Sequence, residues 1–485
     1  MSMPEQLRER AAHASAVPGL VSYTEGRELV WTWAELEEHA RSVADAIASR
    51  TSRPERTVLV AEAEGRADDV LALIGMLCTG LPVAVLPRNS PQSLGQALRE
   101  TLLGHGYDLV DARDSGIEVT RSKSAKRGDL PAESLLMASG GSSGRPKIVV
   151  DRRMRAIAAA PRAARPTSLM NWHAGQRQLV VGALHHASTL GFFIEGLADG
   201  NTLIVPHSFD PATALSLISA WQVRWLHLTP YHMRHLAFAM EKREYSLASL
   251  RGLVHLAAPC PHSLKRRWLN LMPPECIFEL YGATEGIGIT IARGDEWMAR
   301  PGTAGRGFFT HVRILDADGI ALPPGEEGDI YMRSGLGSSP GHTYLDANDT
   351  MKVSVDGFSS VGDRGHLDDD GYLYVAARQL TRIQVGGETV DPSEVESVLI
   401  AHPSVLDAGV VGVPDERLGE SLVALVVTTG HDASSLRRYL REKMAAYKVP
   451  RAIHVVDHLP YTEIGKLDRA ALAERAALGR VAGKQ

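Results

Sequence analysis

"QLVVGALHHASTLGFFIEGLADGNTLIVP", residues 178–206, decides the expected fold. Its first apolar run, 178–184, predicts a buried strand, and the segment that follows has a helical pattern ending near Gly200. The apolar run over 201–206 then predicts a second strand. A strand, a helix and a further strand in this order are typical of α/β proteins built on parallel sheets.

The same alternation continues to about residue 285. Asp210 followed by Pro211 indicates a helix N-terminus, because Asp caps the free backbone N–H groups and Pro suits the first helical position. Strands are then predicted over 223–228, 250–258 and 277–282, separated by helices over 231–240 and 262–271. Repeated units of this kind predict parallel sheets covered by helices, with ligands at the carboxyl ends of the strands.

The first hundred residues contain one apolar run of nearly membrane-spanning length. This run, "VLALIGMLCTGLPVAVL" (70–86), is slightly short for a span and contains Gly80 and Pro82, so a helix, a glycine turn and a buried strand are expected. Before it, Thr32 and Glu35 form a capping-box pattern that starts a helix over 30–48. Residues 1–17 lack the apolar centre of a signal peptide. We therefore expect a soluble protein without a membrane partner.

Composition bounds the size, compartment and partners of the protein. A chain of 485 residues exceeds what one hydrophobic core usually supports, so at least two domains are expected. The formal charge of 52 − 57 = −5 gives no reason to expect nucleic acid or an anionic membrane as a partner. The three cysteines, Cys78, Cys260 and Cys276, have no CxxC spacing, which suits the cytoplasm.

The pattern changes at about residue 305. Helical patterning stops, and stretches bounded by Gly and Asp predict strands within 312–319, 328–335 and 371–378. After 383 a small α/β unit follows, with a helix capped by Asp391, two strands over 405–413 and 421–428, and a helix with Leu436, Leu440 and Met444 on one side. We expect an N-terminal domain over 1–377 with a β-rich subdomain over 305–377, a hinge at 378–382 and a C-terminal α+β lobe over 383–485.

The stretch "SGGSSGRPK" (139–147) has the chemistry of a phosphate site. Backbone N–H groups and serine hydroxyls can cradle phosphate oxygens, the glycines permit close approach, and Lys147 adds a positive charge. The spacing is not that of the common P-loop, whose Lys precedes Ser or Thr, because Ile148 stands there. Taken alone, these residues leave a phosphate site and a flexible surface turn both open.

Together with four further stretches in the same order, this loop resembles the signatures of the adenylate-forming superfamily, which contains acyl-CoA synthetases, adenylation domains of peptide synthetases and firefly-type luciferases. The further stretches are "ELYGATEG" (279–286), "SSVGDRGHLDDDGYLYVAAR" (359–378), "VGGETVDPSEVE" (385–396) and "LPYTEIGKLDR" (459–469). The resemblance is closest to acyl- and aryl-CoA ligases, and it implies a large N-terminal domain with a small mobile C-terminal lobe.

The resemblance implies a nucleotide site. The loop would grip the β- and γ-phosphates of ATP, and Tyr281 would stack on adenine. Thr284 would touch the α-phosphate and Glu285 would bind Mg²⁺, while Asp363 and Arg378 would bind the ribose. The implied nucleotide-binding residues are Ser139, Gly140, Gly141, Ser142, Ser143, Gly144, Lys147, Ala258, Pro259, Tyr281, Gly282, Asp363 and Arg378. Each also fits a structural role: Tyr281 a core aromatic, Asp363 a turn residue.

The implied reaction has two half-reactions. A carboxylate attacks the α-phosphorus of Mg·ATP to give an acyl-adenylate and pyrophosphate, and a thiol, usually that of coenzyme A, then displaces AMP. Preorganised cations are the main catalytic resource for the first step, because an anion must approach a polyanion. The resemblance gives this role to Lys466, together with Mg²⁺ on Glu285, and it names Thr284 and His186 as further catalytic residues.

The second half-reaction needs a rotation of the C-terminal lobe. Gly386, Gly387 and Glu388 resemble the ligase motif whose glycines keep a pantetheine tunnel clear. The sequence departs from the family at the hinge, where Leu380 replaces the usual Asp or Lys and Ala377 replaces a Gly. Either Leu380 biases the lobe toward one orientation and slows thioester formation, or it is a tolerated variant.

The expected acid pocket lies around "LHHASTLGF" (184–192). His186 aligns with the aromatic gate beside the carboxylate, and the segment 179–198 contains none of the Asp residues that peptide-synthetase domains use to hold an amino group. An acid without an α-amino group is therefore favoured. The pocket would also use His227, Thr229, His232, His255, Gly282 and Gly288. Several polar groups around an otherwise apolar cavity favour a bulky or ring-containing acid with an oxygen function. His232 and His235 could be metal ligands, but helix-face or surface histidines are favoured because a third ligand is lacking.

These observations favour an AMP-forming acid–thiol ligase of biosynthesis that uses ATP, Mg²⁺ and coenzyme A. Two alternatives stay open: a stand-alone adenylating enzyme that passes its acyl group to a carrier protein or partner enzyme, and a non-catalytic scaffold. Retention of Lys147, Glu285, Asp363, Arg378 and Lys466 argues against the scaffold. A homodimer is the default expectation for the assembly.

Overall fold

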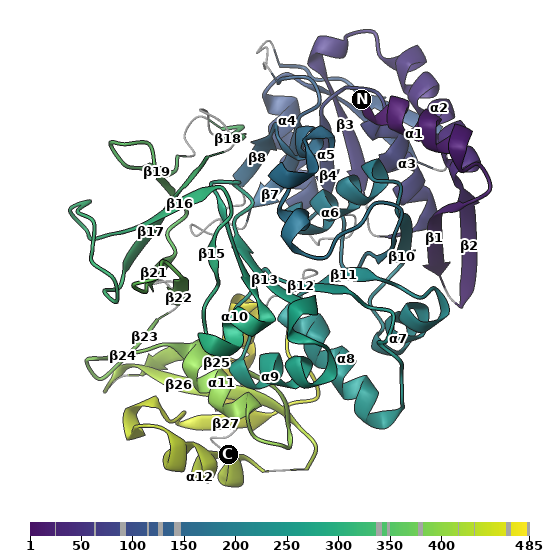
Figure 1. Ribbon diagram of the computed structural model, residues 1–485. Coiled ribbons are helices and arrows are strands. Elements are labelled where there is room, and N and C mark those ends of the chain that lie inside the picture. Colours follow the sequence, from purple (N-terminus) through teal and green to yellow (C-terminus); the bar gives the residue numbers. More distant parts are fainter. Residues whose placement is uncertain are drawn as a thin grey trace.

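The computed structural model describes residues 1–24, 26–62, 65–87, 94–113, 116–124, 130–139, 147–335, 342–346, 350–376, 382–415, 417–430, 432–461 and 467–482. Within these residues the chain is a mixed α/β structure with four sheets (Figure 1). The expected α/β class is confirmed. Among the described helices, none combines the length and the apolar character that crossing a bilayer requires.

The largest sheet has the strand order β15-β14-β13-β12-β11-β9-β10-β1-β2. Its strands are β1 (Pro18–Thr24), β2 (Arg27–Thr32), β9 (Arg177–Leu179), β10 (Thr202–Pro206), β11 (Trp225–Leu228), β12 (Gly252–His255), β13 (Ile277–Gly282), β14 (Ile289–Arg293) and β15 (Arg306–Gly307). The strands from β10 through β9, β11 and β12 to β13 are parallel neighbours, as the alternation predicts. The helices in this region are α6 (Ala187–Ala198), α7 (Pro211–Ala220), α8 (Pro230–Lys242), α9 (His262–Leu271) and α10 (Gly294–Ala299).

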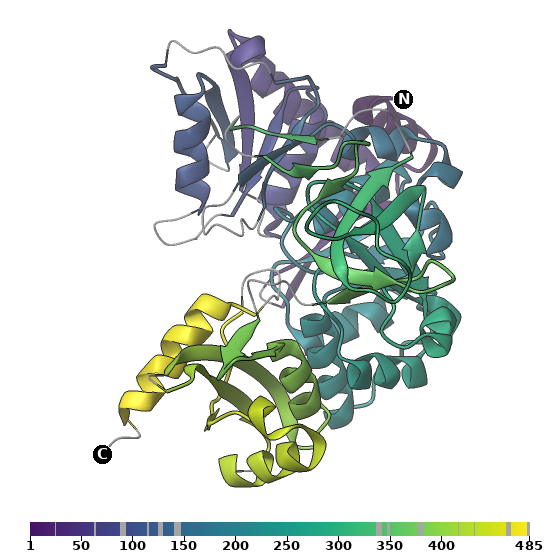
Figure 2. The same cartoon turned by 90° about the vertical axis from the view of Figure 1, so that its left-hand side faces the viewer.

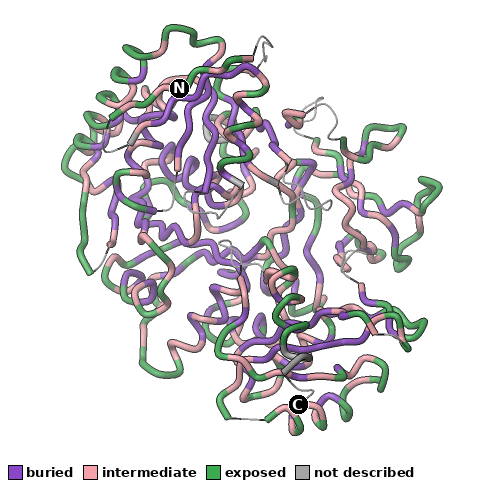
Figure 3. The backbone as a smooth tube through the Cα atoms, turned by 180° about the vertical axis from the view of Figure 1, so that it is seen from behind, coloured by how far each residue is buried: buried purple, intermediate pink, exposed green. Residues whose placement is uncertain are grey.

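A second sheet has the order β18-β8-β7-β4-β3-β5-β6. Its strands are β3 (Thr57–Glu62), β4 (Val83–Leu86), β5 (Asp108–Arg113), β6 (Gly116–Thr120), β7 (Leu135–Ser139), β8 (Lys147–Asp151) and β18 (His342–Tyr344). The helices that accompany it are α1 (Met3–His13), α2 (Trp33–Arg50), α3 (Ala67–Leu77), α4 (Leu94–Gly104) and α5 (Met154–Ala159). Side chains of α2, α3, α6 and strands of both sheets share one hydrophobic cluster. In Figure 3 much of the backbone in the interior is purple, the colour of buried residues. The apolar run over 70–86 is therefore core, as expected.

Two smaller sheets follow along the chain. One contains β16 (Thr310–Leu315), β17 (Gly328–Ser334), β19 (Lys352–Val353), β20 (Ser359–Ser360), β21 (Arg364–Leu367) and β22 (Leu373–Ala376). The other, which has its own core, contains β23 (Ile383–Val385), β24 (Glu388–Val390), β25 (Val405–Asp415), β26 (Gly419–Thr428) and β27 (Ala452–Val455). Its helices are α11 (Pro392–Ile400), α12 (Ala433–Lys443) and α13 (Arg469–Ala482). We call this C-terminal sheet with its helices the C-terminal unit; it lies at the lower end of the molecule (Figure 2).

Local signals located most elements correctly, and tertiary structure shortened some of them. The strand over 277–282 and the helix over 262–271 are confirmed with the expected bounds. The strand expected over 178–184 was wrong in length, because β9 ends at Leu179 and the chain turns toward α6 at Gly182 with φ of +96°. The strand expected over 250–258 is likewise limited to β12, and Ala257 beyond it has φ of +74°.

Candidate active site

The expected phosphate loop joins the paired ends of two strands. Ser139 on β7 is the register partner of Lys147 on β8, so the loop between them is the connection of a β-hairpin. Gly140, Gly141, Ser142, Ser143 and Gly144 lie outside the described residues. The Lys147 ammonium lies 4.8 Å from the centre of the Tyr344 ring and donates a hydrogen bond to the Thr350 carbonyl oxygen at 3.5 Å. The lysine is therefore placed at the edge where β18 joins the sheet.

Tyr344 connects this lysine to the expected Mg²⁺ ligand. It lies on β18, which pairs antiparallel with β8, and its hydroxyl donates to Glu285 Oε1 at 3.1 Å. Sequence reasoning missed Tyr344, because the pairing of β18 with β8 joins segments about 195 residues apart and leaves no local signal. The described residues contain no group of three His, Cys, Asp or Glu side chains suited to a metal. A single carboxylate nevertheless fits Mg²⁺ beside a nucleotide, since Mg²⁺ usually takes one or two carboxylates, with phosphates and water completing its shell.

The expected adenine and ribose residues are in contact. The Tyr281 hydroxyl, at the end of β13, donates to Asp363 Oδ2 at 2.8 Å across 82 residues of sequence. The Tyr281 ring packs against the cluster that contains Ile287, Ile330 and Met332, so its structural role as a half-buried aromatic is real. Thr284 lies in the turn closed by the Gly286 N–H and the Ala283 carbonyl at 2.9 Å. Two motifs of the resemblance thus meet at the carboxyl end of β13.

The remaining nucleotide candidates are placed nearby or not described. Ala258 and Pro259 follow β12, the parallel neighbour of β13, and are not buried. Gly282 is exposed, and a Cβ atom added there would lie 3.0 Å from Ile289 Cγ2. Arg378, Leu380 and Ala377 at the expected hinge, and Lys466, lie outside the described residues.

Three of the expected acid-pocket residues, His186, His227 and Thr229, lie where α6 and α8 begin, whereas Gly282 and Gly288 lie at the end of β13 and just before β14. His186 is the N-cap residue of α6, with its ring 4.1 Å from that of His185. His227 on β11 is buried, and its Nε2 lies 3.2 Å from Thr189 Oγ1 on α6. Burial lowers the pKa of His227 to about 4, so this imidazole is neutral at physiological pH. A neutral imidazole can donate one hydrogen bond and accept another.

Further residues expected in the acid pocket have structural roles as well. Thr229 caps α8, and its Oγ1 lies 3.1 Å from His232 Nδ1. His232 is therefore buried in a cap rather than exposed, and burial lowers its pKa to about 3. At Gly288 an added Cβ would lie 2.4 Å from Thr310 Cγ2, so the position excludes any side chain.

His255, which is also expected in the acid pocket, lies in a buried ion cluster. Its Nε2 contacts the Lys265 ammonium and lies 3.5 Å from Glu279 Oε2, while Lys265 donates to the same carboxylate at 3.3 Å. Lys265 and His255 are fully buried. Burial and then the Lys265 charge lower the pKa of His255 well below its ordinary value. The three side chains stabilise the junction of β12, β13 and α9, because buried charges are tolerated only when paired.

The glycine pair of the expected thiol tunnel forms a tight turn. Gly386 and Gly387 connect β23 to β24 with φ of +59° and +93°, which is the two-residue hairpin geometry that favours glycine at both positions. The Gly386 N–H donates to the Leu418 carbonyl at 2.9 Å, and Glu388 is exposed. The turn conformation therefore explains why glycine stands at both positions, independently of any tunnel.

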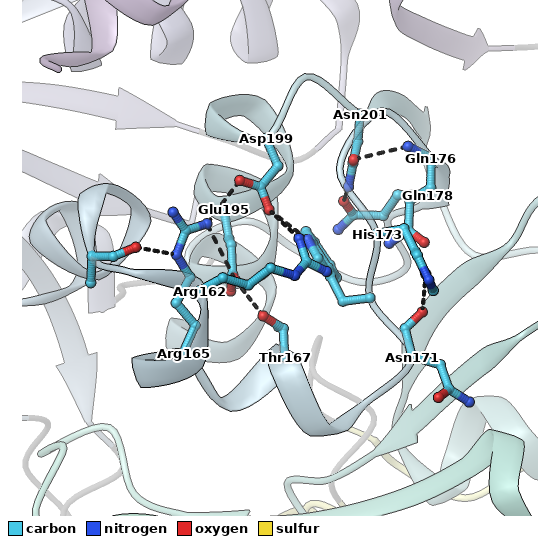
Figure 4. Close-up of polar contacts among 12 residues, drawn as sticks. Arg162, Arg165, Thr167, Asn171, His173, Gln176, Gln178, Glu195, Asp199 and Asn201 are labelled. Atoms are coloured by element: carbon cyan, nitrogen blue, oxygen red, sulfur yellow. Dashed lines mark hydrogen bonds and ion pairs between the residues drawn. The ribbon is translucent and has the colours of Figure 1, made fainter.

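A second polar cluster lies at the other end of α6, away from His186 (Figure 4). Arg165 donates to Asp199 Oδ1 at 2.8 Å, Trp172 donates to Asp199 Oδ2 at 2.7 Å, and Thr167 donates to the buried Glu195 carboxylate. Burial raises the pKa of Glu195 to about 7. These contacts attach the 160–176 segment to α6 and were not expected from the sequence, since the residues share no motif.

A surface hollow of about 930 Å³ is also present, lined by residues within 244–251 and 271–276. These segments precede β12 and β13, so the hollow lies at the amino ends of the strands. Ligands of parallel α/β sheets bind at the carboxyl ends, where Tyr281 and His227 lie. The hollow is therefore separate from the candidate site.

The chain is similar to known AMP-binding enzymes. The family model described as AMP-binding enzyme matches residues 108–341, and that described as AMP-binding enzyme C-terminal domain matches 394–466. The chain is 33% identical to a feruloyl-CoA synthase from Amycolatopsis sp over 70% of this chain and 69% of that protein. It is 28% identical to a 4-chlorobenzoate–CoA ligase from Arthrobacter sp over 91% of this chain and 90% of that protein.

The fold also matches a solved structure. An o-succinylbenzoate–CoA synthetase from Bacillus subtilis, in complex with its acyl-adenylate intermediate, superimposes with a TM-score of 0.74 at 24% identity over 97% of this chain and 98% of that chain. The family models and the feruloyl-CoA synthase relative define an adenylate-forming enzyme, and the fold agrees. The chain belongs to the AMP-binding enzyme family, as an AMP-forming acid–thiol ligase.

Proposed function

We propose that this enzyme converts a bulky or cyclic carboxylic acid without an α-amino group into its adenylate, and then into its coenzyme A thioester. The observation that carries the proposal is the convergence of three motifs through two contacts, Tyr344 with Glu285 beside Lys147, and Tyr281 with Asp363. The names of two relatives contain feruloyl and 4-chlorobenzoate, which both derive from acids with a ring. The neutral His227 suits a ring acid with an oxygen function, because it offers a hydrogen bond without a charge.

Each residue has one task in this proposal. Lys147 and the serines of its loop hold the outer phosphates, Thr284 contacts the α-phosphate, and Tyr281 and Asp363 hold adenine and ribose. Tyr344 orients the Glu285 carboxylate, which holds Mg²⁺. The metal, when bound, neutralises charge on the phosphates. Lys466 bridges the acid and the α-phosphate, His186 and His227 line the acid pocket, and Gly282 and Gly288 keep it open.

The division of labour along the chain is part of the proposal. Residues 1–377 form the domain that binds nucleotide and acid, 378–382 form the hinge, and 383–485 rotate between the half-reactions. In the second orientation the turn at Gly386 and Gly387, with Glu388, borders the path of the thiol. Leu380 at the hinge favours the first orientation. The acyl acceptor is coenzyme A, and the assembly is a homodimer.

Pyrophosphate exchange with purified enzyme tests this function. A screen of aliphatic, monocyclic aryl and polycyclic acids is expected to give exchange with ring acids only, in a Mg²⁺-dependent manner. Lys466→Ala is expected to lower exchange by a factor of about 10² to 10³ while nucleotide binding is retained, because one preorganised cation of the transition state is lost. Near-normal exchange in Lys466→Ala would refute the role of Lys466. A wild-type enzyme that exchanges pyrophosphate only with aliphatic acids, or with none, would refute the proposed substrate class or activity.

A further inference from the structure

Three polar side chains join α8 to the C-terminal unit. The Arg234 guanidinium on α8 contacts the Asp407 carboxylate on β25 through Nη1 and Oδ1. The Tyr461 hydroxyl, beyond β27, donates to Asp407 Oδ2 at 2.7 Å and accepts from Arg234 Nη1 at 3.2 Å. We call these three residues the α8 latch. It connects residues that lie 173 and 227 positions apart in the sequence.

The α8 latch is shielded from water. Arg234 and Asp407 are 8% and 5% exposed, and the Tyr461 ring packs 4.5 Å from that of Tyr231 in the first turn of α8. Burial and then the Asp407 charge raise the pKa of Tyr461 above its ordinary value, so its hydroxyl remains a donor. A buried charge that loses its partner is strongly destabilised, whereas both ions regain hydration if the two surfaces separate. The contact therefore favours two discrete states, closed or fully open.

The latch lies next to the segment that carries Lys466. Tyr461 is bridged to Leu467, so the two ends of the intervening stretch are fixed together beside α8. The first turn of α8 follows Thr229, at the carboxyl end of β11, where the acid-pocket candidates lie. The C-terminal unit accordingly lies beside the helices of the large sheet in Figure 2.

We propose that Arg234, Asp407 and Tyr461 are positioning residues that hold the C-terminal unit in the adenylate-forming orientation and separate when the enzyme proceeds to thioester formation. The inference rests on the proposed two-step function. No bond is made or broken by these residues. They act by fixing the position of Tyr461 and Leu467, which flank the segment that carries Lys466, during the first half-reaction.

Half-reactions measured separately test the α8 latch. In Asp407→Asn the pyrophosphate-exchange rate is expected to fall at least about tenfold, because the Arg234 charge is left without its partner. Thioester formation from added acyl-adenylate and coenzyme A, in a single turnover, is expected to stay within about twofold of wild type. Tyr461→Phe removes only the hydroxyl and should cause a smaller loss in the same direction. Equal slowing of both half-reactions, or slowing of thioester formation alone, would overturn the proposal.

Glu396→Gln is the matched control, since Glu396 accepts hydrogen bonds from Arg469 at 2.9 and 3.0 Å inside the C-terminal unit. It should leave the ratio of the two rates unchanged. Amide hydrogen exchange of the substrate-free enzyme tests the α8 latch without relying on activity. It therefore distinguishes a wrong latch proposal from a wrong proposed function. Asp407→Asn should accelerate exchange in 230–237 and 405–411, and Glu396→Gln should not accelerate it in 230–237. Unchanged protection of 230–237 in Asp407→Asn would refute the latch whether or not the wild type has activity.

Discussion

The Glu195→Gln substitution should remove a pH-dependent loss of stability. Glu195 is 5% exposed at the far end of α6, and burial raises its pKa to about 7 from the ordinary value of 4.5. Between these two pH values the folded protein binds a proton that the unfolded chain has released, so stability falls as pH rises through this window. A difference of about 2.5 pKa units corresponds to roughly 3 kcal/mol, and most of it lies between pH 5 and pH 8. Glutamine is neutral throughout.

Thermal and urea unfolding at pH 5 and pH 8 measure this effect as a difference between variant and wild type, in which the other titrating groups cancel. The unfolding free energy of Glu195→Gln relative to wild type should increase by roughly 2–3 kcal/mol from pH 5 to pH 8. Glu244→Gln, at an exposed position, is the control and should show no such change. A variant-to-wild-type difference that is the same at both pH values would refute the link between burial and stability at this site.

Two further substitutions test individual contacts. Tyr344→Phe removes the hydrogen bond to Glu285, and we expect the KM for Mg·ATP to rise about tenfold to a hundredfold, as for loss of one bond to a charged group; an unchanged KM would remove Tyr344 from the site. Gly387→Ala places a side chain at φ of +93° with nothing within 4 Å of the added Cβ, so strain should destabilise the protein by about 1–2 kcal/mol. A lowered melting temperature supports the turn role of this glycine, whereas slower thioester formation at unchanged stability would favour the tunnel role alone.

The sequence located the elements that carry local signals. Thr32 and Asp210 mark helix starts that the structure confirms, because a cap is a contact over three residues. The parallel sheet followed from the alternation of strands and helices. Residues of the nucleotide motifs were found by resemblance, and the structure brings Tyr281 and Asp363 into contact.

What the sequence could not supply was long-range pairing. Tyr344 reaches Glu285 because β18 leaves the β-rich segment and adds to the second sheet, and no periodicity in 342–344 specifies that partner. In the sequence, Arg234, Asp407 and Glu195 look like ordinary charged surface residues. Their burial depends on the distant segments that pack over them. The contact of His255 with Lys265 was not expected for the same reason, because Lys265 lies on α9 rather than on a neighbouring strand position.

The contacts of the motifs, of the scaffold and of the α8 latch differ in strength. This difference explains how a rigid scaffold can support a reaction that needs two orientations of the C-terminal unit. The motif contacts seen here are single hydrogen bonds at partly exposed positions, Tyr344 with Glu285 and Tyr281 with Asp363, each worth roughly 1.5–3 kcal/mol, so a bound ligand that offers comparable contacts can rearrange them. The scaffold beneath them is held by contacts between fully buried side chains, such as that of Lys265 with His255. Between these extremes lies the α8 latch, which is buried while closed and hydrated once open. An interaction of that kind can hold the C-terminal unit during adenylation and still release it, because separation restores the hydration that burial removed.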